Sequence, residues 1–144
     1  MASALEQVGV ECRIVDAPAA RLGWAPIEAT LEEFQPDLLV VGVTQATFDL
    51  DAQAARLAKQ LCPGVLTVAR GEIFLTDDRK CLDRIPELDV VIRGESELPI
   101  QDIGRGLPLE EIRGLTYRRD GGLHRTPHRP LLEDLDELPY PARH

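Results

Sequence analysis

The most constraining feature of this sequence is an uninterrupted apolar run that follows Pro36-Asp37 and ends at Thr44, with the sequence Leu-Leu-Val-Val-Gly-Val. Strands that expose one face to water alternate apolar and polar residues, whereas strands covered on both faces do not. We therefore expect this run to form a central strand of a parallel sheet, with helices packed on both of its faces.

Two further apolar runs, Val65–Ala69 and Leu88–Ile92, follow helical segments at about 49–61 and 78–85. A short strand is also predicted over 12–15, between a truncated N-terminal helix and a helix that begins near Pro26. Successive strand-helix units imply right-handed crossovers and a parallel sheet. The predicted fold class is α/β, a doubly wound parallel sheet of the Rossmann-like or flavodoxin-like type.

The chain opens on a helix, whereas a doubly wound domain usually begins with a strand that is central to its sheet. The sequence therefore predicts a sheet that lacks its first strand. Either the chain is a fragment, or the fold closes without that strand, or another chain supplies it. Because an unfilled central position leaves backbone groups unpaired, we hypothesise a homodimer. A single monomeric peak in light scattering would contradict it.

The pattern changes beyond Gly106. Residues 114–118 and 123–126 flank a glycine-rich turn at 120–122 and predict a β-hairpin. Residues 130–144 are acidic and contain prolines, which is typical of an extended arm or linker. We predict an α/β unit over residues 1–106, a hairpin extension over 107–129 and a linker over 130–144.

Charge and hydropathy narrow the classes of partner. Acidic residues number 25 against 16 basic ones, for a net charge of −9, which argues against a nucleic-acid partner. Only residues 113–129 are locally basic, and we interpret them as a solvated hairpin face or, alternatively, as a surface for anionic phosphate or propionate groups of a ligand. The sequence contains neither a membrane-spanning run nor a signal-peptide pattern, so we expect no membrane partner and a cytoplasmic location.

Three cysteines, Cys12, Cys62 and Cys81, are odd in number and widely spaced. Their spacing suggests neither a disulfide framework nor a metal motif, so we expect three reduced thiols.

The polar segment after the Leu88–Ile92 run is the first candidate site. A strand that ends at Arg93-Gly94 and continues into a helix exposes backbone N–H groups at its carboxyl end, where ligands of open α/β sheets bind. The alternative is that Glu95 or Ser96 caps the helix and that Glu97 stabilises its first turn. For each residue taken alone, capping is the simpler interpretation.

Four segments, taken in order, give the sequence a family resemblance. They read FQPDLLVVGVT at 34–44, LDVVIRGESE at 88–97, IRGLTYR at 112–118 and LEDLDELPYP at 132–141. In this combination the chain resembles the N-terminal cobalamin-binding domain of cobalamin-dependent radical S-adenosylmethionine enzymes. That group includes anaerobic magnesium-protoporphyrin monomethyl ester cyclases, methyltransferases and other Fe-S oxidoreductases. The resemblance covers nearly the whole chain.

The resemblance implies three loops that contact the cofactor. The residues concerned are Thr44, Gln45, Ala46 and Thr47 in the first loop, Ala69, Arg70 and Gly71 in the second, and Gly94, Glu95, Ser96 and Glu97 in the third. The family's GGxHxT pattern is only partly kept in the second loop, where Arg70 brings a long charged side chain to a place that a glycine would leave open. The Gly-Glu-x-Glu pattern of the third loop is intact.

Two absences qualify what the resemblance implies. No Asp-x-His-x-x-Gly element is present, and His124, His128 and His144 fall in the hairpin or the arm, so the expected cofactor is a cobalamin without a protein histidine ligand. The CxxxCxxC motif of the radical domain is absent, so a [4Fe-4S] cluster and S-adenosylmethionine are expected only in a longer parent chain. The expected partners are a corrinoid and a radical S-adenosylmethionine domain.

A rival hypothesis is a degenerate fold that serves as an interaction or dimerisation module without a cofactor. Arg70 and the missing first strand both favour it. An independent enzyme is less favoured because no nucleophilic triad, P-loop or metal cluster is recognisable. A phospho-acceptor domain built on Asp16, Asp37 and Lys59 is also disfavoured, because Asp37 begins its strand instead of ending it.

Overall fold

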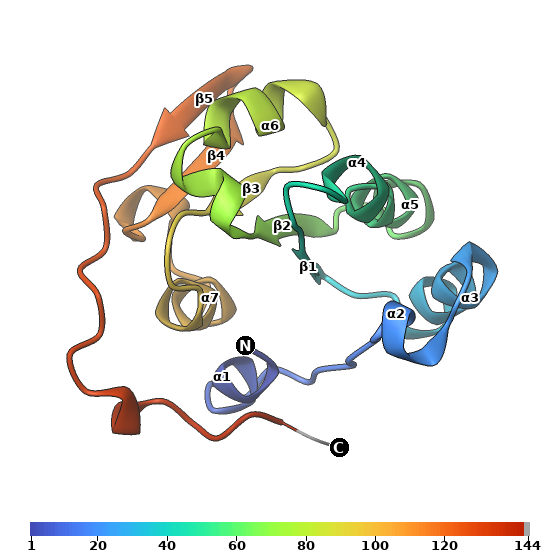
Figure 1. Cartoon of the computed structure of the whole chain (residues 1–144), viewed down its shortest axis with the longest axis horizontal. Coiled ribbons are helices and arrows are strands. Elements are labelled where there is room, and N and C mark those ends of the chain that lie inside the picture. Colours follow the sequence, from blue (N-terminus) through green and yellow to red (C-terminus); the bar gives the residue numbers. More distant parts are fainter. Residues whose placement is uncertain (143–144) are drawn as a thin grey trace.

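A computed structural model of the protein describes residues 1–142 and contains a five-stranded mixed sheet with the strands in sequential order (Figure 1). The strands are β1 (Leu38–Gly42), β2 (Leu66–Arg70), β3 (Val90–Ile92), β4 (Leu115–Arg119) and β5 (Gly122–Arg125). β1, β2 and β3 are parallel, whereas β4 and β5 are antiparallel to their neighbours. The predicted α/β class is confirmed, and the predicted hairpin extends the sheet.

Helices cover both faces of the sheet (Figure 1). They are α1 (Ala2–Glu6), α2 (Ala17–Ala20), α3 (Trp24–Phe34), α4 (Phe48–Asp51), α5 (Gln53–Leu61), α6 (Asp78–Arg84) and α7 (Glu97–Gly104), with short 3-10 turns η1 (Glu72–Leu75), η2 (Leu109–Glu111) and η3 (Leu135–Glu137). Val68 and Val90 point toward α1 and α7, whereas Ala69 and Val91 point toward α4, α5 and α6. Strands with both faces buried account for the unbroken apolar runs in the sequence.

Two predictions about the N-terminal part are wrong. Residues 12–15 do not form a strand, and β1 lies at the edge of the described sheet instead of at its centre. Both outcomes have one physical cause, because no strand among residues 1–142 lies beside the segment 12–15 to form a ladder with it. Within these residues β1 pairs only with β2, and Leu38–Val41 stay half-buried.

The C-terminal residues 130–142, here called the arm, are extended apart from η3 and pass α7 before they reach the neighbourhood of α1 (Figure 1). The last two residues of the predicted linker, including His144, lie outside the described residues.

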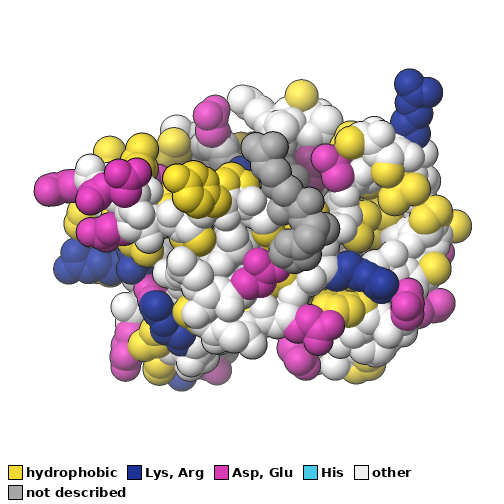
Figure 2. All heavy atoms as spheres, turned by 90° about the horizontal axis from the view of Figure 1, so that it is seen from below, with side chains coloured by type: hydrophobic (Ala, Val, Ile, Leu, Met, Phe, Trp, Pro, Cys, Tyr) yellow, Lys and Arg dark blue, Asp and Glu magenta, His cyan; other side chains and the backbone are white. Residues whose placement is uncertain are grey.

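Two further observations concern the length of the helices and the distribution of charge on the surface. No helix in the described part of the chain is long and apolar enough to cross a membrane. Figure 2 shows acidic and basic side chains interspersed over one face, with exposed hydrophobic side chains among them.

Candidate functional site

The carboxyl ends of β1, β2 and β3 meet at one edge of the sheet, here called the carboxyl edge. The Val43 N–H donates to the carbonyl of Arg70 at 2.9 Å, which joins the segment after β1 to the end of β2. Arg70 is in turn the register partner of Ile92 in β3. The three segments that sequence reasoning grouped are therefore neighbours in space, as expected for adjacent parallel strands.

Residues 44–47 form an exposed loop that its own hydroxyl groups hold in shape. The Oγ1 atoms of Thr44 and Thr47 lie 2.7 Å apart, and the Thr47 hydroxyl donates to the carboxylate of Asp51 in α4. The Thr44 N–H also donates to Asp51, at 3.4 Å. Asp51 thus organises the loop without belonging to any motif that sequence reasoning singled out.

The segment at the end of β2 presents one candidate residue to solvent and buries another. Ala69 is fully buried in the core, whereas Arg70 is exposed. The Arg70 guanidinium lies against Gly42. A Cβ added to Gly42 would be 3.4 Å from the Nε and Nη2 atoms of Arg70. At Gly71, a built Cβ would lie 2.3 Å from the Val43 carbonyl oxygen, so the two loop backbones touch. Arg70 therefore lies across the end of β1.

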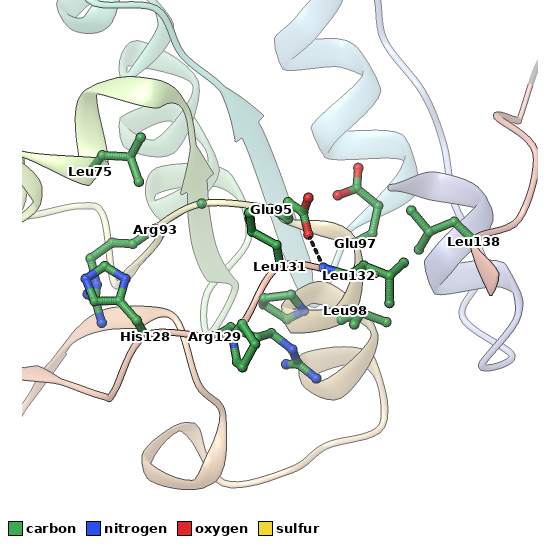
Figure 3. Close-up of a pocket in the computed structure, with 13 residues that line it drawn as sticks. Leu75, Arg93, Glu95, Glu97, Leu98, His128, Arg129, Leu131, Leu132 and Leu138 are labelled. Atoms are coloured by element: carbon green, nitrogen blue, oxygen red, sulfur yellow. Dashed lines mark hydrogen bonds between the residues drawn. The ribbon is translucent and has the colours of Figure 1, made fainter. Parts of the chain in front are cut away.

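In the Gly94–Glu97 segment, the backbone of Gly94 is accessible and the carboxylates of Glu95 and Glu97 each accept a hydrogen bond from a backbone N–H group. Gly94 is exposed, has a φ of +95° and has no atom within 4 Å of the position that a Cβ would occupy, so its backbone is accessible. The Glu95 carboxylate accepts from the Leu132 N–H at 3.0 Å and so holds the arm (Figure 3). Glu97 accepts from the backbone N–H of Ser96 at 3.0 Å. Ser96 is buried and α7 has no side-chain cap hydrogen bond, so the expected capping by Ser96 or Glu95 is not found.

A small cavity of about 120 Å³ lies between this segment and the arm (Figure 3). Leu75, Gly94, His128 and Leu132 are among the residues that line it. Ligand pockets start at about 300 Å³, so the cavity is too small for a tetrapyrrole. A planar ligand would have to lie on the exposed carboxyl edge. Sequence reasoning placed His128 in the hairpin or arm and gave no signal that it would lie beside Gly94.

A buried ion-pair network anchors the end of β3. The Asp78 carboxylate lies 3.7 Å from the Nε of Arg93 and 3.2 Å from the Nε of Arg125. Arg93 is 3% exposed and also donates to the carbonyls of Leu115 and Thr126. Burial, followed by the nearby charge of Arg125, lowers the pKa of Arg93, while Asp78 opposes that change. The network fixes the backbone immediately before Gly94.

The described residues include no group of three His, Cys, Asp or Glu side chains that could hold a metal ion. Cys12, Cys62 and Cys81 are free in the described part of the chain, and burial raises the pKa of each thiol. Lys59 pairs with Asp89, which precedes β3, at 2.6 Å. Lys59 therefore lies toward the amino ends of the strands, far from where a phospho-acceptor lysine is needed.

Residues 1–103 match the family described as the B12 binding domain. An uncharacterized methyltransferase of Pyrococcus horikoshii is 31% identical over 138 residues, which cover 92% of this chain and 30% of that protein. The anaerobic magnesium-protoporphyrin IX monomethyl ester cyclase of Cereibacter sphaeroides is 20% identical over 146 residues, which cover 96% of this chain and 24% of that enzyme.

Among solved structures, the radical S-adenosylmethionine methyltransferase TsrM of Kitasatospora setae, with cobalamin and a [4Fe-4S] cluster bound, superposes with a TM-score of 0.72. Sequence identity to it is 19%, and the match covers 99% of this chain and 27% of that one. At this identity the likeness establishes the fold. The chain spans less than a third of the length of each of these relatives.

Proposed function

The chain belongs to the B12-binding domain family, and from that premise we propose that it seats a cobalamin on the carboxyl edge of β1, β2 and β3. The observation that carries the proposal is that the three strand ends are neighbours: the Val43–Arg70 hydrogen bond and the Gly71 contact join the ends of β1 and β2, and Arg70 is the register partner of Ile92 at the end of β3. The part played by this domain is binding and orientation, because the cofactor itself supplies the chemistry of its cobalt.

The proposed contacts divide by what each segment offers. Residues 44–47 offer exposed hydroxyl and amide groups that Asp51 holds in place. Gly94 offers open backbone, which a flat ligand can approach closely. Gly71 and Arg70 stand between these two segments. Ala69 and Ser96 are buried, so we assign them to the support of the loops and not to the contact surface.

We propose that the parent protein is longer and cytoplasmic and that it carries a radical S-adenosylmethionine domain with a [4Fe-4S] cluster. Its activity would be that of an Fe-S oxidoreductase, methyltransferase or cyclase. The supporting facts are the relatives' names and the short span of the match. The division into an α/β unit (1–106), a hairpin extension (107–129) and a linker (130–144) remains part of this proposal.

A second candidate function is an interaction or dimerisation module without a cofactor. It is favoured by Arg70, which lies across the end of β1, and by the unpaired edge of β1. This candidate predicts a homodimer in light scattering and no interaction with a corrinoid.

Binding to hydroxocobalamin separates the two candidates. We expect the chain to co-elute with the corrinoid and to shift its visible spectrum. Gly94→Ala should weaken binding about tenfold, which is about 1.4 kcal/mol. The added Cβ strains the positive φ and also keeps a ligand from approaching the backbone closely. The matched control is Gly121→Ala, since Gly121 has a φ of +76° and equally open space but lies in the β4–β5 turn. Equal effects of the two variants, or no binding by the wild type, would refute the proposed site.

His128 provides a separate prediction about the cobalt ligand. We propose that the bound cobalamin has no protein histidine ligand, so His128→Ala should leave the visible spectrum of the bound cofactor unchanged. The His128 ring already lies 3.4 Å from an Arg93 nitrogen, inside the small cavity, and serves that contact. A spectrum that changes in His128→Ala, and is restored by added imidazole, would make His128 a ligand.

A further inference from the structure

The arm lies across the carboxyl end of β3, beside the proposed corrinoid surface. The cavity next to Gly94 is lined by Leu75 of η1 and by Leu98 of α7 (Figure 3). η1 and α6 pack on one face of the sheet, whereas α7 packs on the other. Side chains of the arm line the same cavity, and they are those of Pro130, Leu131, Leu132 and Leu138. Because elements from both faces and the arm bound this one cavity, the arm lies over the end of the strand between them.

The chain is firmly anchored just before the arm begins. The Gly114 N–H donates to the carbonyl of Pro127 at 2.8 Å, and a Cβ added to Gly114 would lie 3.5 Å from the Cβ of Arg129. The Arg129 guanidinium pairs with Asp102 of α7 at 2.7 Å. These contacts fix the point from which the arm leaves the domain.

The arm itself is held by few contacts. Among the described residues, one hydrogen bond joins residues 130–142 to the rest of the chain, and in it the Leu132 N–H donates to the Glu95 carboxylate at 3.0 Å. Leu131 and Leu135 are 74% and 66% exposed, so much of the apolar surface of the arm is not packed. A segment with so few buried contacts opens at a small cost in free energy while its anchor stays in place.

Building on the proposed function, we propose that the arm is a strap that closes on Glu95 in the free protein and moves aside when a corrinoid is seated against Gly94. A planar ligand that rests on Gly94 extends over the end of β3, where Leu131 and Leu132 lie in the closed state. The space under the closed strap is about 120 Å³, whereas ligand pockets begin at about 300 Å³. The closed strap and the seated ligand therefore exclude each other, and the Glu95–Leu132 hydrogen bond is the latch.

The closed strap lowers the apparent affinity for the ligand. A ligand that binds the open state alone shifts the arm toward that state, and its apparent Kd is the intrinsic Kd divided by the fraction of open protein. A change that weakens the latch without touching Gly94 should therefore tighten binding.

Leu132→Pro is the test variant, because proline lacks the N–H that donates to Glu95. The matched control is Glu133→Pro, one residue further along the same extended segment. Glu133 is exposed, does not line the cavity, and its N–H makes no hydrogen bond to another described residue. We expect Leu132→Pro to bind hydroxocobalamin about tenfold more tightly than the wild type, as for a wild-type strap that is open about one tenth of the time. Glu133→Pro should bind as the wild type does.

Hydrogen exchange of the Leu132 amide is a second measurement that needs no substitution. In the free wild type this amide should be protected by its hydrogen bond to Glu95. Saturating hydroxocobalamin should speed its exchange about tenfold, because the strap then stays open. The Gly114 amide, which donates to Pro127 ahead of the arm, should keep its protection and serves as the internal control.

The possible results separate the strap from the proposed function. Equal affinities of the three chains, with unchanged exchange at Leu132, would overturn the strap and leave the corrinoid site standing. Slower exchange at Leu132 in the complex, with weaker binding by Leu132→Pro, would also overturn the strap, since the arm would then be a fixed wall of the site. No binding of hydroxocobalamin by any of the three chains would refute the proposed function itself, and the strap with it.

Discussion

Replacing Asp78 with asparagine is expected to lower the free energy of unfolding by about 3 kcal/mol, the low end of what removal of one partner from a buried ion pair costs. The substitution keeps the size of the side chain and an oxygen that can accept from the Thr116 hydroxyl, which donates to Asp78 in this structure, but it removes the negative charge. Arg93, 3% exposed, would then face Arg125 without a counter-charge. Urea unfolding followed by far-UV circular dichroism measures the change.

Asp120→Asn is the matched control for this prediction. Asp120 makes an ion pair with Arg119 at 3.7 Å, but its side chain is 89% exposed, so the same loss of charge should change stability by less than about 0.5 kcal/mol. Asparagine also tolerates the positive φ at this position. Equal stabilities of the two variants would show that the Asp78 network contributes little to the fold.

The network also connects stability to the candidate site. Arg93 is the residue before Gly94, and its guanidinium bonds the carbonyls of Leu115 and Thr126 in the hairpin region. With Asp78→Asn, the end of β3 should become more mobile, and hydroxocobalamin binding should weaken in parallel with stability. Gly94→Ala, in contrast, should weaken binding with a smaller loss of stability. The two variants therefore separate a supporting role from a contact role.

Sequence patterns predicted the parts of this fold that depend on local composition. The apolar runs that became β1, β2 and β3 need no partner to be recognised, and the glycine-rich turn at 120–122 marks the hairpin. The segment 12–15 has the same kind of composition but is not a strand. A β-strand forms only when its backbone is hydrogen-bonded to a neighbouring strand. The local sequence of a segment does not specify which other segment, if any, will pair with it.

The candidate site was predictable only in outline for the same reason. The chain order of strands and helices is enough to bring residues 44–47, Gly71 and Gly94 to one edge. The ion pair between Asp78 and Arg125 joins residues far apart in the sequence, and Arg125 belongs to the basic segment that we interpreted as a solvated face. Glu95 was predicted to cap a helix or contact a ligand, and it instead holds the arm through Leu132. These contacts depend on packing across elements, which composition and spacing do not encode.

The second large effect is expected at Gly71, where the loops after β1 and β2 touch. A Cβ at this position would lie 2.3 Å from the Val43 carbonyl oxygen and 3.0 Å from a Val43 methyl group. Because the nearest atom belongs to the backbone, it cannot move aside as a side chain can, and the two loops must separate. We expect Gly71→Ala to destabilise the protein by about 2 kcal/mol, within the range measured for overpacking, and to weaken hydroxocobalamin binding about tenfold.

The cause of this effect is steric and not conformational. The backbone of Gly71 is extended, a conformation that alanine adopts freely, so the loss cannot come from a forbidden φ. Gly23→Ala is the control, because Gly23 has an ordinary φ and no atom within 4 Å of a built Cβ, and it should change stability by less than about 1 kcal/mol. If Gly71→Ala lost stability but bound the corrinoid as tightly as the wild type, contact between these two loops would not be what forms the binding surface.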